Sequence, residues 1–197
     1  MKVLTLFSGT HSVGKALELF PGSEEITLDL HQPADIQEDV LTWDYTMFAP
    51  HSFDIIWASP ECTMYSRARV KAKTPRDLDH ADAMVNKTLQ IIDYLRPKVW
   101  FIENPESGLL KSRNMMLLRP YYEVDYCKYD CCIRKRTAIW SNIVLNLNTC
   151  TAQDRCPLFI GGRHVFYLEH IESGPVRGSI PVLLLQSIFE QAAEYIG

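Results

Sequence analysis

The chain has 197 residues, which is enough for one well-cored domain and too short for two full ones. Its hydrophobic fraction of 47%, charged fraction of 22% and net charge of −4 are ordinary for a globular protein and argue against unspecific polyelectrolyte binding. Apolar runs are shorter than the ~20 residues of a membrane-spanning helix, and the first residues resemble a strand rather than a signal peptide. We therefore expect a cytoplasmic protein, without a membrane partner, whose cysteines are reduced.

Strand and helix patterns alternate along the chain. Strands are predicted at residues 2–7, 26–28, 54–57, 99–102, 121–126 and 137–142, with a weaker unit around residues 36–40. Helices are predicted at residues 15–19, 78–95 and 181–196. This order predicts one α/β domain over residues 1–197, with a mostly parallel sheet covered on both faces. Residues 143–177 lack a periodic pattern and form a loop-rich insert.

Two predicted strands end in residues that can do chemistry. Cys62 lies on a Pro-containing loop after the strand at 54–57, and Glu103 directly follows the strand at 99–102. Reacting groups in open α/β sheets collect outside the carboxyl ends of the strands. The pair therefore indicates covalent catalysis by a thiol with assistance from an acid, although a single cysteine is more commonly a buried small hydrophobe.

The first strand and turn suggest a site for a nucleoside-bearing cofactor. The glycine of Phe7-Ser8-Gly9 lets the backbone approach a ligand, and Asp29 ends the next strand at the distance expected for a carboxylate that binds ribose hydroxyls. Asp39 either accepts a hydrogen bond from an adenine amine or caps a turn.

Taken together, these segments resemble the C5-cytosine DNA methyltransferase family over nearly the whole chain. The similar segments, in the family's order, are Leu6-Phe7-Ser8-Gly9, Ser59-Pro60-Glu61-Cys62 with Tyr65-Ser66, Ile102-Glu103-Asn104-Pro105, Arg134-Lys135-Arg136 and Gly178-Ser179-Ile180-Pro181. The likeness is greatest to the short methylases of bacteriophage genomes and prophages. It implies a Rossmann-like fold that binds S-adenosylmethionine and methylates cytosine in DNA.

The resemblance assigns roles to particular residues. Cys62 would be the nucleophile that attacks C6 of cytosine, Glu103 would hold or protonate ring N3, and Arg134 and Arg136 would position the base. The residues implied for the cofactor are Phe7, Ser8, Gly9, Thr10, His11, Asp29, Asp39, Pro60 and Ser179. Those implied for the substrate are Ser66, Arg67, Arg69 and Asn104. The target cytosine must be flipped out or single-stranded, because a base inside a duplex cannot be reached.

Several positions depart from the family pattern. His11 stands where a second glycine is usual, and Cys132 stands where a glutamine is usual. Glu61 places a carboxylate beside the thiol, which would raise the pKa of Cys62. Only residues 143–177 occupy the place of the family's large target-recognition region, so we expect short or relaxed sequence specificity.

The other cysteines suggest a metal. Cys127, Cys131, Cys150 and Cys156 could converge on one structural zinc ion that holds the insert, although their spacings are not those of a standard zinc knuckle. Simple burial of strand cysteines is the alternative. The departures at other positions leave two further possibilities: a methyltransferase that acts on RNA or uses a modified cofactor, and a catalytically impaired protein that binds cofactor or DNA.

Overall fold

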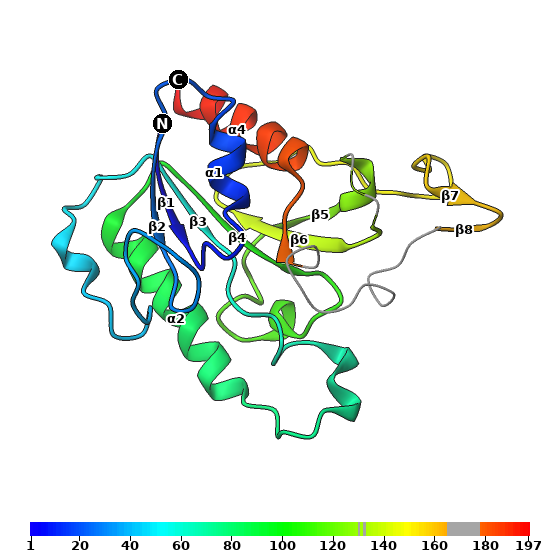
Figure 1. The fold of residues 1–197 in the computed structure, drawn as a ribbon, viewed down its shortest axis with the longest axis horizontal. Coiled ribbons are helices and arrows are strands. Elements are labelled where there is room, and N and C mark those ends of the chain that lie inside the picture. Colours follow the sequence, from blue (N-terminus) through cyan, green and yellow to red (C-terminus); the bar gives the residue numbers. More distant parts are fainter. Residues whose placement is uncertain (130, 132, 165–177) are drawn as a thin grey trace.

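The computed structural model describes residues 1–129, 131, 133–164 and 178–197, which fold around a six-stranded sheet (Figure 1). Its strand order is β2-β1-β3-β4-β6-β5. The strands are β1 (Lys2–Leu6), β2 (Glu24–Leu28), β3 (Ile55–Ala58), β4 (Val99–Pro105), β5 (Tyr121–Asp125) and β6 (Arg136–Ser141). The pairs among β1 to β4 are parallel, and β6 pairs antiparallel with both β4 and β5. The predicted fold class is confirmed.

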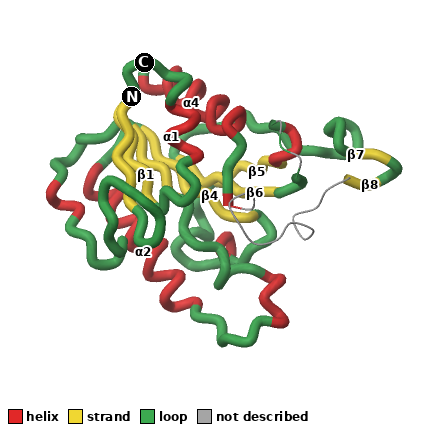
Figure 2. The backbone as a smooth tube through the Cα atoms, viewed as in Figure 1, coloured by secondary structure: helices red, strands yellow, loops and turns green. Residues whose placement is uncertain are grey.

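Helices cover both faces of this sheet (Figure 2). α1 (Ser12–Leu17) and α4 (Val182–Ile196) pack together on one face, and α2 (Leu78–Leu95) lies on the other. Alternate residues of each strand point to opposite faces, so Val3 packs with α1 and α4 while Leu4 packs with α2. The parallel strands are therefore apolar on both sides, as their uninterrupted hydrophobic runs indicate.

The long helix α2 has the predicted bounds, and its end signals account for them. The Asp77 carboxylate accepts a hydrogen bond from the backbone N–H of His80 at 2.9 Å, which caps the first turn. At the other end Arg96 has a left-handed backbone with φ of 48°, and Pro97 follows. α1 begins at Ser12, three residues before its predicted start.

The weaker unit predicted around residues 36–40 is not a strand. Ile36 makes an isolated parallel bridge with Leu28, and Asp39 then starts a turn in which it accepts hydrogen bonds from the following backbone. Short 3-10 helices lie in other connections: η1 (Tyr45–Met47), η2 (Arg67–Lys71), η3 (Leu110–Ser112) and η4 (Tyr126–Lys128).

The insert carries a small hairpin of its own. β7 (Phe159–Ile160) pairs antiparallel with β8 (Arg163–His164) through Gly161 and Gly162, both of which have positive φ. Such a two-residue turn matches the right-handed twist of paired strands. The hairpin projects from the β5–β6 side of the molecule (Figure 1). Residues 165–177 of the predicted insert lie outside the described residues. In the part of the chain that the structure describes, no helix is long and apolar enough to cross a bilayer.

Candidate active site

A cavity of about 410 Å³ opens at the carboxyl ends of β1, β2, β3 and β4. Residues that follow each of these strands line it, together with the start of α1, part of α2 and the segment before α4. Those used below are Phe7, Ser8, Gly9, Thr10, Asp29, Asp39, Pro60, Glu61, Cys62, Glu103, Lys135 and Gly178. Parallel strands bring these segments to one edge of the sheet although they are far apart in sequence.

The loop after β1 has an unusual backbone where it borders the cavity. Phe7, Gly9 and His11 all have left-handed φ angles, of 60°, 51° and 55°. For a bulky residue such as Phe7 this conformation is strained, and such strain persists only where the surroundings hold it. Here the N–H of Gly9 donates to the Asp29 carboxylate at 2.9 Å, which ties the loop to the end of β2.

The backbone at His11 explains why glycine is usual there in the family. With φ of 55°, the position favours a residue without a Cβ, and histidine is among the side chains that tolerate it better than most. The His11 side chain is not among the described groups that line the cavity. Histidine at this position is therefore compatible with the conformation of the loop after β1.

Substitutions at His11 should separate backbone strain from side-chain function. We expect His11→Val to lower the free energy of unfolding by about 1–2 kcal/mol, because a β-branched residue is disfavoured in the left-handed region. His11→Gly should change it by less than about 1 kcal/mol. Urea denaturation measures both values, and equal losses for the two variants would contradict this account.

The acidic residues predicted for the cofactor lie on the cavity wall. Asp29 also accepts the N–H groups of His31 and Gln32, at 2.8 and 2.9 Å, so its carboxylate is fixed in place. Asp39 lines the cavity and accepts the N–H of Leu41, so it caps a turn as well. The hydroxyl of Ser8 is buried without a hydrogen-bond partner among the described residues, although it borders the cavity. These groups could serve a polar ligand.

The segment before α4 reaches the same cavity. Gly178 and Ile180 line it, and the N–H of Ile180 donates to the Ser12 hydroxyl at 3.0 Å, which joins the segment to the start of α1. Thr10 faces the cavity beside them. Ser179, the predicted cofactor residue, lies between the two lining residues and is not itself part of the described lining.

The loop that carries Cys62 is anchored at both ends. Asn104, which is fully buried, donates from its amide nitrogen to the carbonyl of Pro60 at 2.9 Å. Three residues after Cys62, the hydroxyl of buried Tyr65 donates to Asp82 at 2.9 Å, and Asp82 also binds Arg113. Asn104 thus supports the loop that carries Cys62, and it does not belong to the described cavity lining.

Neighbouring charges act in opposite directions on the Cys62 thiol. Burial raises the pKa of Cys62 above its ordinary value, and the negative charge of Glu103 raises it further. The positive charge of Lys135 lowers it. The effect expected for Glu61 is present with the predicted sign but is the smallest of those that raise the pKa. Lys135 is therefore the principal cationic side chain that favours the thiolate.

Glu103 is buried at the end of β4, between a hydroxyl and an ammonium group. The hydroxyl of Tyr126 donates to its Oε1 at 3.1 Å, and Lys135 Nζ lies 3.4 Å from the same oxygen. Burial and the charge of Glu103 raise the pKa of Tyr126 well above its ordinary value, so the phenol keeps its proton and remains a donor. The carboxyl group is thereby held at the cavity wall near Cys62.

The side chains of the three basic residues 134–136 lie in different environments. Lys135 faces the cavity, whereas Arg136 forms a two-pronged ion pair with buried Asp125, with Nη2 2.6 Å and Nε 3.1 Å from its oxygens. Burial, followed by the charge of Arg134, lowers the pKa of His164, which places Arg134 near the insert. Neither arginine is in the described cavity lining.

Lys135 lines the cavity and was not predicted from the sequence. The resemblance directed attention to the two arginines, while the lysine between them brings a positive charge to the cavity wall. His31, His80 and Met84 also line the cavity without having been predicted.

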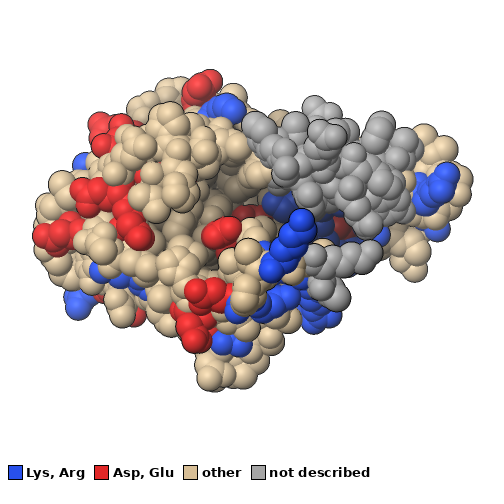
Figure 3. Space-filling view, turned by 60° about the horizontal axis from the view of Figure 1, so that its bottom comes forward, with Lys and Arg blue, Asp and Glu red and all other residues tan. Residues whose placement is uncertain are grey.

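Three of the four predicted substrate residues lie on the loop after Cys62, and the fourth, Asn104, lies in β4. Ser66 precedes η2, and Arg67 is exposed on that helix. Arg69 donates from Nη2 to the carbonyls of Thr74 and Pro75, both at 3.1 Å, so it also stabilises its own loop. On the face drawn in Figure 3, Lys and Arg side chains gather mainly on one side and Asp and Glu side chains on the other. This separation would orient a polyanion on the surface.

Three of the remaining cysteines form a second cluster, whose residues are not in the described cavity lining. Cys127, Cys150 and Cys156 come together with His164, and all four are buried. Cys131, which was predicted to join them, packs instead against the core that contains α1 and α4. Cys132 lies outside the described residues.

Comparison with known proteins identifies relatives of this chain. No family model matches the sequence. A probable DNA (cytosine-5)-methyltransferase of Frog virus 3 (isolate Goorha) is 39% identical over 170 residues, covering 80% of this chain and 78% of the viral protein. The structure of EhMeth, a methyltransferase of Entamoeba histolytica, matches with a TM-score of 0.64 at 12% identity, covering 100% of this chain and 99% of EhMeth.

A DNMT2 structure from Spodoptera frugiperda matches with a TM-score of 0.52 at 16% identity, covering 78% of this chain and 56% of that one. These structural similarities confirm the Rossmann-like methyltransferase fold, and the viral relative covers most of both sequences. The chain belongs to the DNA (cytosine-5)-methyltransferase family.

Proposed function

We propose that this protein transfers a methyl group from S-adenosylmethionine to C5 of cytosine in DNA, through a covalent adduct with Cys62. The observation that carries the proposal is one cavity that holds Cys62 and Glu103 from neighbouring strands together with the Phe7–Gly9 loop and Asp29. A thiol, a carboxyl group and a nucleoside-type pocket in one cavity are the parts that this reaction needs.

The cofactor half of the cavity suits S-adenosylmethionine. Asp29 is a fixed carboxylate for ribose hydroxyls, and Ser8 contributes a hydroxyl that needs a hydrogen-bond partner. Leu28 and Val40 add apolar surface for an adenine ring. When bound, S-adenosylmethionine supplies an electrophilic methyl group on its sulfonium.

The protein's own residues prepare the cytosine for methyl transfer. The Cys62 thiolate forms a bond to C6 and pushes electron density to C5, and Glu103 donates a proton or hydrogen bond to N3, where negative charge would otherwise accumulate. After C5 has accepted the methyl group, a base removes the C5 proton and the S–C6 bond breaks, which regenerates the thiolate. N3 returns its proton to Glu103 in the same step, so the product is neutral 5-methylcytosine. A base that is stacked inside a duplex cannot reach a cavity at the strand ends, so the proposed target cytosine is flipped out of the duplex or already single-stranded.

Lys135 takes the part that the sequence analysis gave to the arginines. Its ammonium group lowers the pKa of Cys62 and lies beside Glu103, so it favours the thiolate while it contacts the acid. Among the described residues that line the cavity, Lys135 is the lysine or arginine side chain. Its ammonium group can donate a hydrogen bond to the O2 carbonyl of a bound cytosine. The loop that carries Arg67 and Arg69 begins four residues after Cys62 and would contact phosphates.

Covalent trapping tests the proposed mechanism. A substrate with 5-fluorocytosine has no C5 proton to lose, so the adduct with Cys62 should accumulate in the presence of S-adenosylmethionine. Denaturing gel electrophoresis and mass spectrometry should show one bond, at Cys62, and none in Cys62→Ser. Parallel DNA and RNA substrates identify the nucleic acid. Cofactor binding without an adduct on any of them would favour the impaired binding protein, and methylation by Cys62→Ser would contradict the mechanism.

Substitutions at Lys135 test its assignment. We expect Lys135→Gln to lower the rate of adduct formation at neutral pH by about tenfold or more, because the positive charge that lowers the pKa of Cys62 is lost. Lys135→Arg keeps the charge and should recover much of that rate. Rapid-quench kinetics measure the step directly, with Lys98→Gln, a surface lysine paired with Asp54, as the control. Equal rates for wild type and Lys135→Gln would remove Lys135 from the mechanism.

A further inference from the structure

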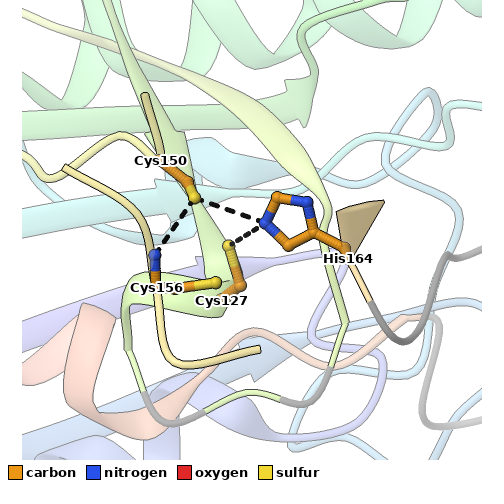
Figure 4. A group of neighbouring side chains, drawn as sticks. All are labelled: Cys127, Cys150, Cys156 and His164. Carbon is orange, nitrogen blue, oxygen red and sulfur yellow. Dashed lines mark hydrogen bonds between the residues drawn. The ribbon is translucent and has the colours of Figure 1, made fainter. Parts of the chain in front are cut away.

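Four side chains of the second cluster point toward a common centre (Figure 4). His164 Nε2 lies 3.6 Å from Cys127 Sγ and 3.3 Å from Cys150 Sγ, and the four candidate ligand atoms all lie within 4.8 Å of one another. The side chains come from three separate segments: η4 after β5, the loop at 150–156, and strand β8 of the hairpin.

These separations agree with a tetrahedral zinc site. With Zn–S bonds of about 2.3 Å and Zn–N bonds of about 2.0–2.1 Å, a tetrahedron places sulfur and nitrogen about 3.5 Å apart and two sulfurs about 3.8 Å apart. The sulfur–nitrogen distances in the structure, 3.6 and 3.3 Å, lie on either side of the tetrahedral sulfur–nitrogen distance. Three thiolates and one imidazole form one of the ligand sets that structural zinc uses.

Surrounding groups hold the ligands in position. The backbone N–H of Cys156 donates to Cys150 Sγ at 3.3 Å, which stabilises negative charge on a thiolate. The Phe159 ring packs edge-on against the His164 ring at 5.1 Å between centres and fixes its orientation. The Gly161-Gly162 turn sets the register that brings Phe159 opposite His164.

Among the residues that the structure describes, the hairpin makes few apolar contacts, so a further constraint is needed to hold it. The cluster of buried residues beneath it consists of Cys127, Cys150 and Cys156, with Leu158 and Phe159 packed against them. A two-stranded hairpin with so small a core is marginal in water, and a structural metal is a common remedy in small units. The cysteines occupy the place where aliphatic side chains would otherwise form a core.

We propose that Cys127, Cys150, Cys156 and His164 bind one Zn²⁺ ion, which fastens the hairpin of the insert to the edge of the catalytic sheet. The three thiols each lose a proton on binding. All four positions are filled by the protein, so the ion is structural rather than catalytic. The metal cluster is also linked to the sheet, because the N–H of Cys150 donates to Asp125 at 2.8 Å. Asp125 lies on β5 and pairs with Arg136. The proposal is independent of the methylation mechanism.

Metal content of the whole protein tests this directly. Protein purified under reducing conditions with added Zn²⁺ should hold about one ion per chain by native mass spectrometry and elemental analysis. Replacement by Co²⁺ should give the visible bands of a tetrahedral ion and an ultraviolet thiolate-to-metal band. Folded wild-type protein that retains less than about a tenth of an ion per chain and gives no such cobalt spectrum would overturn the proposal.

Variants identify the ligands. Cys150→Ser and His164→Asn should each lower metal retention at least about tenfold against a chelator, and Cys150→Ser should also weaken the thiolate band. Cys131→Ser is the matched control, because it removes a neighbouring cysteine that lies outside the cluster, and it should retain the ion. If Cys131→Ser lost metal as Cys150→Ser does, this ligand set would be wrong. Should Cys150→Ser fail to fold, the cobalt spectrum of His164→Asn against that of Cys131→Ser makes the same distinction.

Discussion

Replacing Glu103 by glutamine should slow methylation and at the same time make Cys62 more reactive. The amide cannot protonate N3, so we expect turnover to fall by about 10²-fold or more. Removing the carboxylate also removes one of the charges that raise the pKa of Cys62. More thiolate is then present at a given pH, and alkylation of Cys62 by iodoacetamide should be several-fold faster, as measured by mass spectrometry of the peptide.

The pH dependence of Cys62 alkylation shows in which direction Glu103 shifts the pKa of the thiol. A raised thiol pKa means that the thiolate is lost as pH falls, so wild-type alkylation should increase with pH throughout the neutral range. In Glu103→Gln the same increase should begin at lower pH. Glu61→Gln should shift it in the same direction by less, since Glu61 is the smaller influence on the pKa. Slower alkylation of Cys62 in Glu103→Gln would show that the carboxyl group does not act on the thiol as described.

The sequence was sufficient to predict the fold and the position of the cavity. Uninterrupted apolar runs, each followed by a polar residue, marked the carboxyl ends of parallel strands, and the structure brings Phe7, Asp29, Cys62 and Glu103 from four such ends to one cavity. This succeeded because the convergence of strand ends is a property of the topology and needs no knowledge of side-chain packing.

The placements that the sequence did not reveal share a different origin. Whether Lys135 or Arg136 borders the cavity depends on the backbone at the start of β6 and on the ion pair of Arg136 with Asp125, which the run of three basic residues does not reveal. The second cluster contains His164 and not Cys131. His164 reaches the cluster because of the hairpin register, which is set by two glycines about thirty residues after Cys131. Long-range contacts of this kind have no local signal in a single sequence.

Arg136 pairs with Asp125, which also accepts the N–H of Cys150 beside the second cluster, and substitution of Arg136 should chiefly affect stability. Asp125 is fully buried, and its carboxylate accepts from Arg136 and from the N–H of Cys150. Removing the guanidinium in Arg136→Met leaves a buried charge without its counter-ion, which we expect to lower the free energy of unfolding by about 3–5 kcal/mol. Glu123 also faces Arg136, but at 3.6 Å and partly exposed, so Glu123→Ala should cost less than about 1 kcal/mol.

A double variant separates a structural role of Arg136 from a direct role in catalysis. If the cost of Arg136→Met comes from the unpaired Asp125 carboxylate, removing that charge as well in Asp125→Asn with Arg136→Met should recover much of the lost stability, which urea denaturation measures. A base-positioning arginine would behave differently: Arg136→Met would keep its stability, lose turnover, and gain nothing from the second substitution. Because Asp125 holds the guanidinium by two contacts and Lys135 occupies the cavity, we expect the first result.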